Sequence, residues 1–187
     1  MEKTRCYWPQ NDSLMIKYHD EEWGVPVHDD LKHFEFIVLD AFQAGLSWRT
    51  ILHKREHFKN AFDNFDYKKI SKYTETKVQQ LLNNKNIIRN QLKIRATISN
   101  AKAFMEIQKE FGSFDKYVWQ FVNKTTIINQ YHEHQDIPAI SPESDKLSKD
   151  LNKRGFKFVG STIIYAYMQA AGLVNDHLTS CFCYKRS

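Results

Sequence analysis

The segment that decides the fold is residues 144–172, SDKLSKDLNKRGFKFVGSTIIYAYMQAAG. Its first part predicts a helix with Leu147 and Leu151 on one face, begun by Ser144 as N-cap and stopped by Gly155. After a six-residue link, apolar residues recur at spacings of three and four, which predicts a second helix. The segment therefore predicts two helices joined by a short connection.

The rest of the chain follows the same helical periodicity. Two long amphipathic helices are expected near 31–44 and 90–110. Shorter helices are expected near 48–55, 78–82 and 114–121. Because no segment alternates apolar and polar residues between turn signals, we expect an all-α fold. Residues 1–187 should form a single domain, as one body or as two helical lobes on a shared core, with a looser connection at 132–141.

Composition is typical of a globular, non-membrane protein with a basic surface. The 187 residues are 42% hydrophobic, carry a net charge of +5 and give a pI near 9.0. No apolar run is long enough to span a bilayer and the N-terminus lacks a signal peptide, so we expect a cytoplasmic protein without membrane contact. Basic residues gather at 77–102 and 146–157, either as solvated helix faces or as a phosphate-binding surface. No heptad pattern is visible, so a monomer is expected.

Cysteine and histidine lie near both ends of the chain. Cys6 and His19 at the front, with His177 and Cys181 at the back, supply the two thiolates and two imidazoles that tetrahedral Zn²⁺ prefers. Four protein ligands would make this zinc structural, joining the two terminal segments. Two alternatives stay open: Cys183 in place of Cys181, or buried thiols beside ordinary histidines.

A competing metal motif is HKREH at 53–57, which matches the H-x-x-E-H pattern of inverted zinc metallopeptidases. Its two adjacent cations oppose divalent-metal binding and no third ligand is evident. The histidines of HEH at 132–134 are expected to be solvated.

Aromatic side chains are concentrated in the first 48 residues, where Trp8, Tyr18, Trp23 and Trp48 alternate with acidic residues that include Asp40. Such rings usually form a core with satisfied N–H groups. Several rings beside a carboxylate can also stack a flat heterocycle, and a cationic one would gain cation–π attraction.

Four blocks of this sequence closely resemble the 3-methyladenine DNA glycosylase I family. The blocks are YHDEEWGVP at 18–26, QAGLSW at 43–48, KRGFKFVG at 153–160 and AGLVNDH at 171–177. The resemblance extends essentially from Cys6 to Tyr184. It implies a divergent helix-hairpin-helix glycosylase fold with one structural zinc, whose ligands fall on Cys6, His19, His177 and Cys181. Cys183 would then be a bystander.

The resemblance also implies a reaction and a base pocket. The expected enzyme is a monofunctional DNA repair glycosylase that flips 3-methyladenine out of alkylated double-stranded DNA and hydrolyses its N-glycosidic bond, leaving an abasic site. Tyr18 and Trp48 should line the pocket, with Trp8 and Trp23 beside them. Asp40 and Tyr18 would be the catalytic residues.

Two positions depart from the family pattern. Asp40 stands where most members have Glu, and Met15 where some have Tyr, so base specificity is open. The alternative function is a non-catalytic protein that binds alkylation damage or abasic sites.

DNA contacts are expected from two places. Leu46 would fill the hole left by the flipped nucleotide, although it is equally consistent with an ordinary core leucine. Gly155, Gly160 and the amide of Ser161 would approach phosphate, with charge from Lys157. A DNA-bound enzyme would be nucleoid-associated.

Overall fold

The computed structural model describes residues 3–184 as a predominantly helical molecule. The α-helices are α1 (Ser13–Glu21), α2 (Asp30–Gln43), α3 (Trp48–Ala61), α4 (Tyr67–Ile70), α5 (Glu75–Asn83), α6 (Gln91–Phe111), α7 (Phe114–Val118), α8 (Pro142–Lys153) and α9 (Ser161–Ala170). Three 3-10 turns are η1 (Asp63–Phe65), η2 (Trp119–Val122) and η3 (His134–Asp136). The strands are β1 (Ile127–Ile128) and β2 (Val174–Asn175).

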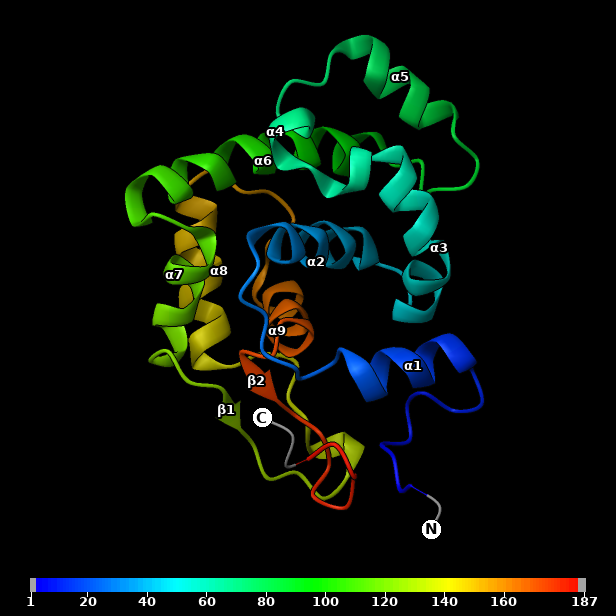
Figure 1. The fold of residues 1–187 in the computed structure, drawn as a ribbon, viewed down its shortest axis with the longest axis vertical. Coiled ribbons are helices and arrows are strands. Elements are labelled where there is room, and N and C mark those ends of the chain that lie inside the picture. Colours follow the sequence, from blue (N-terminus) through cyan, green and yellow to red (C-terminus); the bar gives the residue numbers. More distant parts are fainter. Residues whose placement is uncertain (1–2, 185–187) are drawn as a thin grey trace.

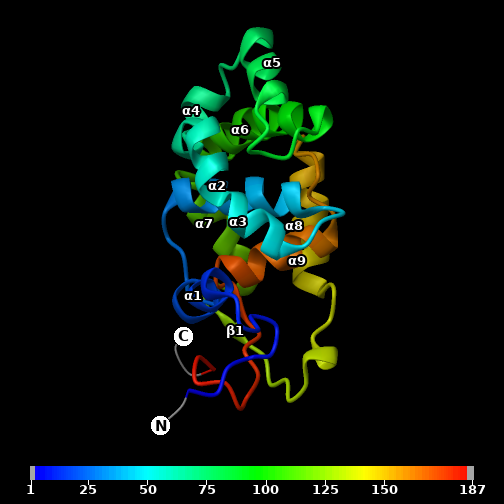
Figure 2. The same ribbon diagram turned by 90° about the vertical axis from the view of Figure 1, so that its right-hand side faces the viewer.

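Helix α2 lies at the centre of the molecule (Figure 1). Its stretch FEFIVLDAF is apolar on nearly every side, so it is buried almost all round, and it packs against α3, α6, α7 and α9. Figure 2 shows α5 and α6 at one end of the molecule and the N-terminal and C-terminal segments together at the other. The described terminal segments thus lie on the same side of the central helix α2.

The two long helices expected near 31–44 and 90–110 are confirmed as α2 and α6. Asp29 and Asn90 cap them by accepting hydrogen bonds from backbone N–H groups, and Gly112, at φ +86°, ends α6. The shorter helices near 48, 78 and 114 are present as α3, α5 and α7.

Helices α8 and α9 pack against each other across the link at 155–160, as expected from residues 144–172. The N-cap was placed wrongly: Ser141, not Ser144, caps α8. Pro142 occupies the first helical turn, where its fixed φ is favourable. Ser144 Oγ accepts the Ser141 N–H at 2.8 Å, which completes a capping box.

The all-α prediction misses one small feature. Strands β1 and β2 pair in parallel, Ile127 with Val174 and Ile128 with Asn175. Two residues cannot display an alternating pattern, so this pairing leaves no signal in the sequence. Among residues 3–184, no helix has both the length and the apolar character needed to cross a membrane.

Gly172 docks the end of α9 onto the segment that follows α1. A Cβ there would lie 2.3 Å from the carbonyl carbon of Val25, and φ is +67°. Val27 N–H donates to the Ala171 carbonyl at 3.0 Å, and Gly24 N–H donates to the Gln169 carbonyl at 2.9 Å. This close backbone contact fixes α1 relative to α9.

Candidate functional site: a buried Cys/His cluster beside an aromatic pocket

The structure brings together the four side chains expected to bind metal. Cys6, His19, His177 and Cys181 are all buried, and their ligand atoms lie within 4.8 Å of one another. Cys181 Sγ is 3.5 Å from His19 Nε2 and 3.6 Å from His177 Nδ1, while Cys6 Sγ is 3.6 Å from His177 Nδ1. This Cys/His cluster has the donors and the geometry to hold a metal ion.

The groups around the Cys/His cluster orient its ligands. His19 Nδ1 is hydrogen-bonded to Asp20 at 2.8 Å, and Asp20 is paired with Arg5 at 2.7 Å. His177 Nε2 donates to the carbonyl oxygen of Trp23 at 3.0 Å. Each imidazole is therefore fixed through one nitrogen and directs the other into the cluster, as in protein metal sites generally.

Backbone amides also point at the sulfur atoms. Leu178 N–H donates to Cys6 Sγ and Cys183 N–H to Cys181 Sγ, both at 3.5 Å. The hydrogen bond from Cys6, with the two imidazoles adding, lowers the pKa of the Cys181 thiol. Cys183 Sγ itself lies 4.0 Å from the His19 carbonyl, outside the four-membered group.

The alternative metal motif is not assembled. His53 is exposed and bonds to Asp12 at 2.7 Å, while His57 is also exposed. Neither histidine belongs to a group of metal-ligand donors in the described part of the chain.

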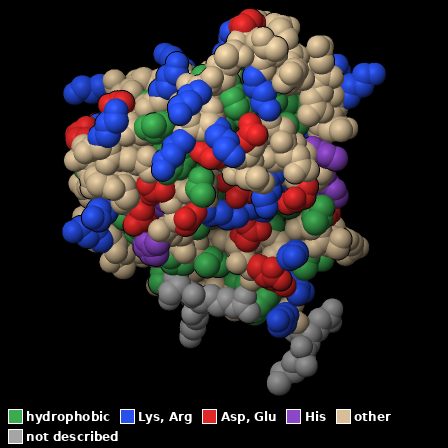
Figure 3. All heavy atoms as spheres, turned by 45° about the horizontal axis from the view of Figure 1, so that its top comes forward, with side chains coloured by type: hydrophobic (Ala, Val, Ile, Leu, Met, Phe, Trp, Pro, Cys, Tyr) green, Lys and Arg blue, Asp and Glu red, His purple; other side chains and the backbone are tan. Residues whose placement is uncertain are grey.

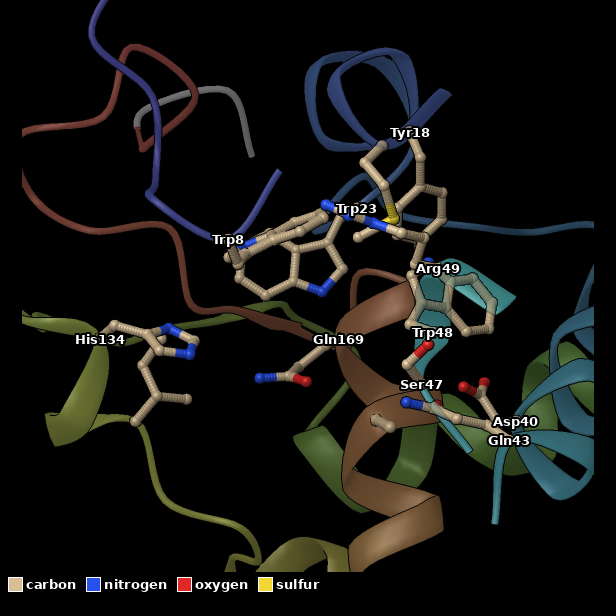
Figure 4. Close-up of a pocket in the computed structure, with 13 residues that line it drawn as sticks. Trp8, Tyr18, Trp23, Asp40, Gln43, Ser47, Trp48, Arg49, His134 and Gln169 are labelled. Atoms are coloured by element: carbon tan, nitrogen blue, oxygen red, sulfur yellow. The ribbon is translucent and has the colours of Figure 1, made fainter. Parts of the chain in front are cut away.

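A cavity of about 430 Å³ lies beside the Cys/His cluster. It is lined by Trp8, Met15, Tyr18, Trp23, Asp40, Gln43, Ser47, Trp48, Arg49, His134, Ile137, Ala166 and Gln169. The four aromatic residues and the acidic residue predicted from the sequence thus surround one cavity (Figure 4).

The rings form two groups on one wall of the cavity. Tyr18 and Trp48 have centroids 5.1 Å apart, and Trp8 and Trp23 are 5.2 Å apart, edge to face. The second pair also contacts the Cys/His cluster: Trp23 lies 4.6 Å from His177 and Trp8 lies 5.3 Å from His19. The cavity wall therefore packs directly against the Cys/His cluster.

Three buried polar atoms in the described chain lack a hydrogen-bond partner, and all three belong to side chains that line this cavity. They are Trp8 Nε1, Trp48 Nε1 and Asp40 Oδ2. Buried polar groups are nearly always satisfied, and leaving one unpaired costs about 1–3 kcal/mol. The side chains that line the cavity therefore carry two unpaired N–H donors and one unpaired carboxyl oxygen.

Burial controls the charge states in the cavity. Asp40 is only 2% exposed, and burial raises its pKa well above the usual value. The pKa of Tyr18 is also raised, first by burial and then by the nearby charge of Asp40, so its phenol keeps its proton. A cation entering the cavity would favour the ionised form of Asp40.

The far wall of the cavity was missed by the sequence analysis. His134 and Ile137 come from the segment around η3, and Gln169 comes from α9. His134, interpreted as simply solvated, is exposed yet lies at the rim. Gln169 Nε2 donates to Asp176 at 2.8 Å. One signal was available: Gln169 is the polar residue within the apolar run IIYAYMQAA.

The residues expected to contact DNA lie outside this cavity. Leu46 is 41% exposed in the turn between α2 and α3, so it is not an ordinary core leucine. In the link between α8 and α9, Gly155 has φ +93°, and a Cβ added at Gly155 or Gly160 would meet no atom within 4 Å. The Lys157 side chain is exposed, and Gly160 caps α9 without a side-chain hydrogen bond. Ser161 Oγ bonds to Ser144 Oγ at 2.8 Å.

Part of the basic run at 77–102 is paired with acidic residues or buried. Lys77 pairs with Asp63 at 3.5 Å, and Arg95 pairs with Glu75 at 2.8 Å. Lys93 is buried instead of exposed. Figure 3 shows Lys and Arg side chains spread over this face with acidic side chains between them. Within the run at 77–102, Lys85, Arg89 and Lys102 remain exposed.

Comparison with known proteins agrees with this fold and cavity. The methyladenine glycosylase family matches residues 8–184. DNA-3-methyladenine glycosylase 1 of Escherichia coli (strain K12) is 48% identical over 180 residues, covering 96% of each chain. DNA-3-methyladenine glycosylase of Haemophilus influenzae is 45% identical, covering 96% of this chain and 97% of that protein.

Solved structures give the same result. A crystal structure of 3-methyladenine DNA glycosylase I has a TM-score of 0.94 and 50% identity, covering 96% of this chain and 99% of that one. The structure describing 3-methyladenine recognition by the Staphylococcus aureus enzyme has a TM-score of 0.92 and 34% identity, with 95% coverage of both chains. The fold is thus one that DNA base glycosylases adopt. The chain belongs to the methyladenine glycosylase family, which confirms the resemblance found in the four sequence blocks.

Proposed function

We propose that this protein is a monofunctional DNA-3-methyladenine glycosylase that hydrolyses the N-glycosidic bond of 3-methyladenine in alkylated double-stranded DNA. Its relatives are named DNA-3-methyladenine glycosylases, and the chain matches them over almost its whole length. We take residues 1–187 as a single catalytic domain that acts as a cytoplasmic monomer.

The observation that carries this proposal is the set of unpartnered polar atoms in the aromatic cavity. Trp8 Nε1, Trp48 Nε1 and Asp40 Oδ2 are held ready without protein partners. A flat, cationic heterocycle with polar edges supplies both the aromatic contact and the missing hydrogen bonds.

The chemistry needs little acid catalysis. Alkylation at N3 gives the purine a positive charge, so the base is already a good leaving group. When the C1′–N9 bond breaks, its electron pair neutralises the base. Water then adds to the oxocarbenium-like sugar at C1′ and loses a proton to solvent. Asp40 accepts a hydrogen bond from the base edge and stabilises the cation, and the Tyr18 phenol donates. No lysine lines the cavity among residues 3–184, which supports hydrolysis without a Schiff-base step.

Two surface elements support extrusion of the nucleotide from DNA. Leu46 occupies the space vacated in the duplex. The link at 155–160 brings its glycine backbone and the N-terminal amides of α9 against phosphate, with Lys157 adding charge. Product is an abasic site and free 3-methyladenine.

The cofactor we propose is one structural Zn²⁺ per chain, held by Cys6, His19, His177 and Cys181. Tetrahedral Zn²⁺ with Zn–S near 2.3 Å and Zn–N near 2.0 Å requires S···N separations of about 3.5 Å. The observed separations of 3.5 and 3.6 Å fit this requirement. With four protein ligands, the ion stabilises the joined terminal segments and takes no part in the reaction.

The test is release of 3-methyladenine from methylated duplex DNA, with Trp48→Ala and Trp48→Phe compared with wild type. Stacking on an aromatic ring is worth about 1–3 kcal/mol per base, so Trp48→Ala should weaken binding of free 3-methyladenine about 5- to 150-fold. Trp48→Phe should lose much less. Wild-type protein that binds abasic or alkylated DNA without releasing base would instead identify a non-catalytic damage binder.

A further inference from the structure

Helix α6 contacts both surface elements that the proposed function assigns to DNA. Lys93 and Asn100 are seven residues apart, two helical turns, so they lie on the same face of α6. Both side chains are buried, with exposures of 7% and 1%. Neither lines the aromatic cavity.

Lys93 holds the turn that carries Leu46. Its Nζ donates to the carbonyl oxygens of Phe42 at 2.9 Å and Ala44 at 2.6 Å. These carbonyls end α2, where a cation is favoured by the helix dipole. The next residue is Gly45, at φ +80°, and Leu46 N–H closes the turn onto the Gln43 carbonyl at 2.6 Å. The ammonium group therefore fixes the direction in which Leu46 leaves α2.

Asn100 holds the link between α8 and α9 in the same way. Its Oδ1 accepts the Lys157 N–H at 2.8 Å and its Nδ2 donates to the Lys157 carbonyl at 3.0 Å. Both backbone groups of Lys157 are thus bound to one side chain. Lys93 Nζ also lies 5.9 Å from the ring of Phe158, whose φ is +55°. One face of α6 consequently contacts the turn at 44–47 and the link at 155–160.

We propose that Lys93 and Asn100 are positioning residues that fix the distance between Leu46 and the Lys157 backbone. Leu46 can then enter the base stack while the link at 155–160 binds a phosphate of the same duplex. This inference rests on the proposed glycosylase function. Extrusion of a nucleotide requires pushing at the base stack while the backbone is held, and a misplacement near 1 Å can cost about 100-fold in rate. Binding of free 3-methyladenine requires neither Leu46 nor the Lys157 backbone.

The experiment compares Lys93→Met with Lys109→Met. Both remove one lysine charge from α6, but Lys109 is exposed at the far end of the helix, where it pairs with Glu106. Single-turnover excision from duplex DNA, base flipping by 2-aminopurine fluorescence beside the lesion, and the Kd of free 3-methyladenine are measured for each. Lys93→Met should slow excision and flipping about 10- to 100-fold and leave the Kd for free base within about twofold. Lys109→Met should match wild type.

Two further variants keep the inference falsifiable if Lys93→Met folds poorly. Asn100→Ala acts on the other element and should reproduce the same split between DNA excision and free-base binding. Lys93→Arg, whose guanidinium can reach the same two carbonyls, should restore excision. Equal losses in Lys93→Met and Lys109→Met, or a parallel loss of free-base affinity, would overturn the positioning role. Absence of base release by wild-type protein would instead refute the proposed function.

Discussion

Replacement of Asp40 by leucine should make the protein more stable and inactive. Asp40 is 2% exposed, and its Oδ2 has no hydrogen-bond partner in the described chain. Leucine has the same branching at Cγ, and the adjoining cavity of about 430 Å³ accepts its extra volume. Removing a buried unsatisfied group recovers about 1–3 kcal/mol. For a domain of this size, about 2–4 °C per kcal/mol gives a rise in Tm of about 2–12 °C.

The stability gained by Asp40→Leu should increase with pH. Burial raises the pKa of Asp40 in the folded state above its value of 3.8 when unfolded. The folded state therefore binds this proton more tightly, and the associated stability is lost as pH rises through the raised pKa. Asp40→Leu should exceed wild type by more at pH 8 than at pH 5.

Urea unfolding at both pH values, with calorimetry of 3-methyladenine binding, tests both parts. Asp40→Asn is the matched control, because it keeps the shape and a polar group but cannot ionise. It should remove only the pH-dependent part of the wild-type stability. Both variants should lose affinity for the cationic base. A leucine variant less stable than wild type at both pH values would refute the reasoning.

Three further predictions concern the metal, the backbone and a buried histidine. Cys181→Ala should lose about one equivalent of zinc by atomic absorption and on the order of several kcal/mol of stability, whereas Cys183→Ala should keep its zinc. At Gly172, φ is +67° and an added Cβ would lie 2.3 Å from the Val25 carbonyl carbon, so Gly172→Ala should lower the free energy of unfolding in urea by about 2–5 kcal/mol. At Gly155, φ is +93° but the space is open, so Gly155→Ala should lower it by about 1–2 kcal/mol. Burial lowers the pKa of His33 from 6.5, against the opposing effect of Asp115, so stability falls as pH drops below 6.5. His33→Gln should flatten the stability profile between about pH 7 and pH 5, and an unchanged slope would contradict this.

The elements that the sequence predicted are those whose signals are local. Helices α2 and α6 have long apolar periodicity, and each is capped by a side chain adjacent to its start. Helix α1 was not predicted, because its mixed sequence SLMIKYHDE has almost no net hydrophobicity and its start depends on Asp12 accepting from two backbone amides. Its position is set by packing against α3, which periodicity cannot reveal.

The residues of the candidate site likewise divide into those with a signal in the sequence and those placed only by the tertiary fold. Cys6, His19, His177 and Cys181 have donor types that bind zinc, but donor type alone left Cys183 as an alternative to Cys181. The resemblance to the glycosylase family selected between them. The far side of the cavity could not be predicted, since His134 reaches it from the segment around η3 and Gln169 from α9, and only the tertiary fold brings these two elements together. Nor does spacing reveal that Lys93, which looks like a member of a basic surface, is buried on the α2 carbonyls.

The arrangement also explains how the cavity keeps its polar atoms unpaired. Trp8 follows Cys6 by two residues, and the Trp23 carbonyl accepts a hydrogen bond from His177. The Cys/His cluster thus supports Trp8 and Trp23 on their side away from the cavity. Gly172 fixes the segment after Trp23 against α9. Without such support, the side chains around Asp40 could rearrange to donate a hydrogen bond to its carboxyl group or to fill the cavity. The cost of about 1–3 kcal/mol for the unpaired carboxyl group would then be relieved, but the cavity would be lost. Because the aromatic side chains are held from outside the cavity, that cost is retained until a ligand of matching charge and shape removes it.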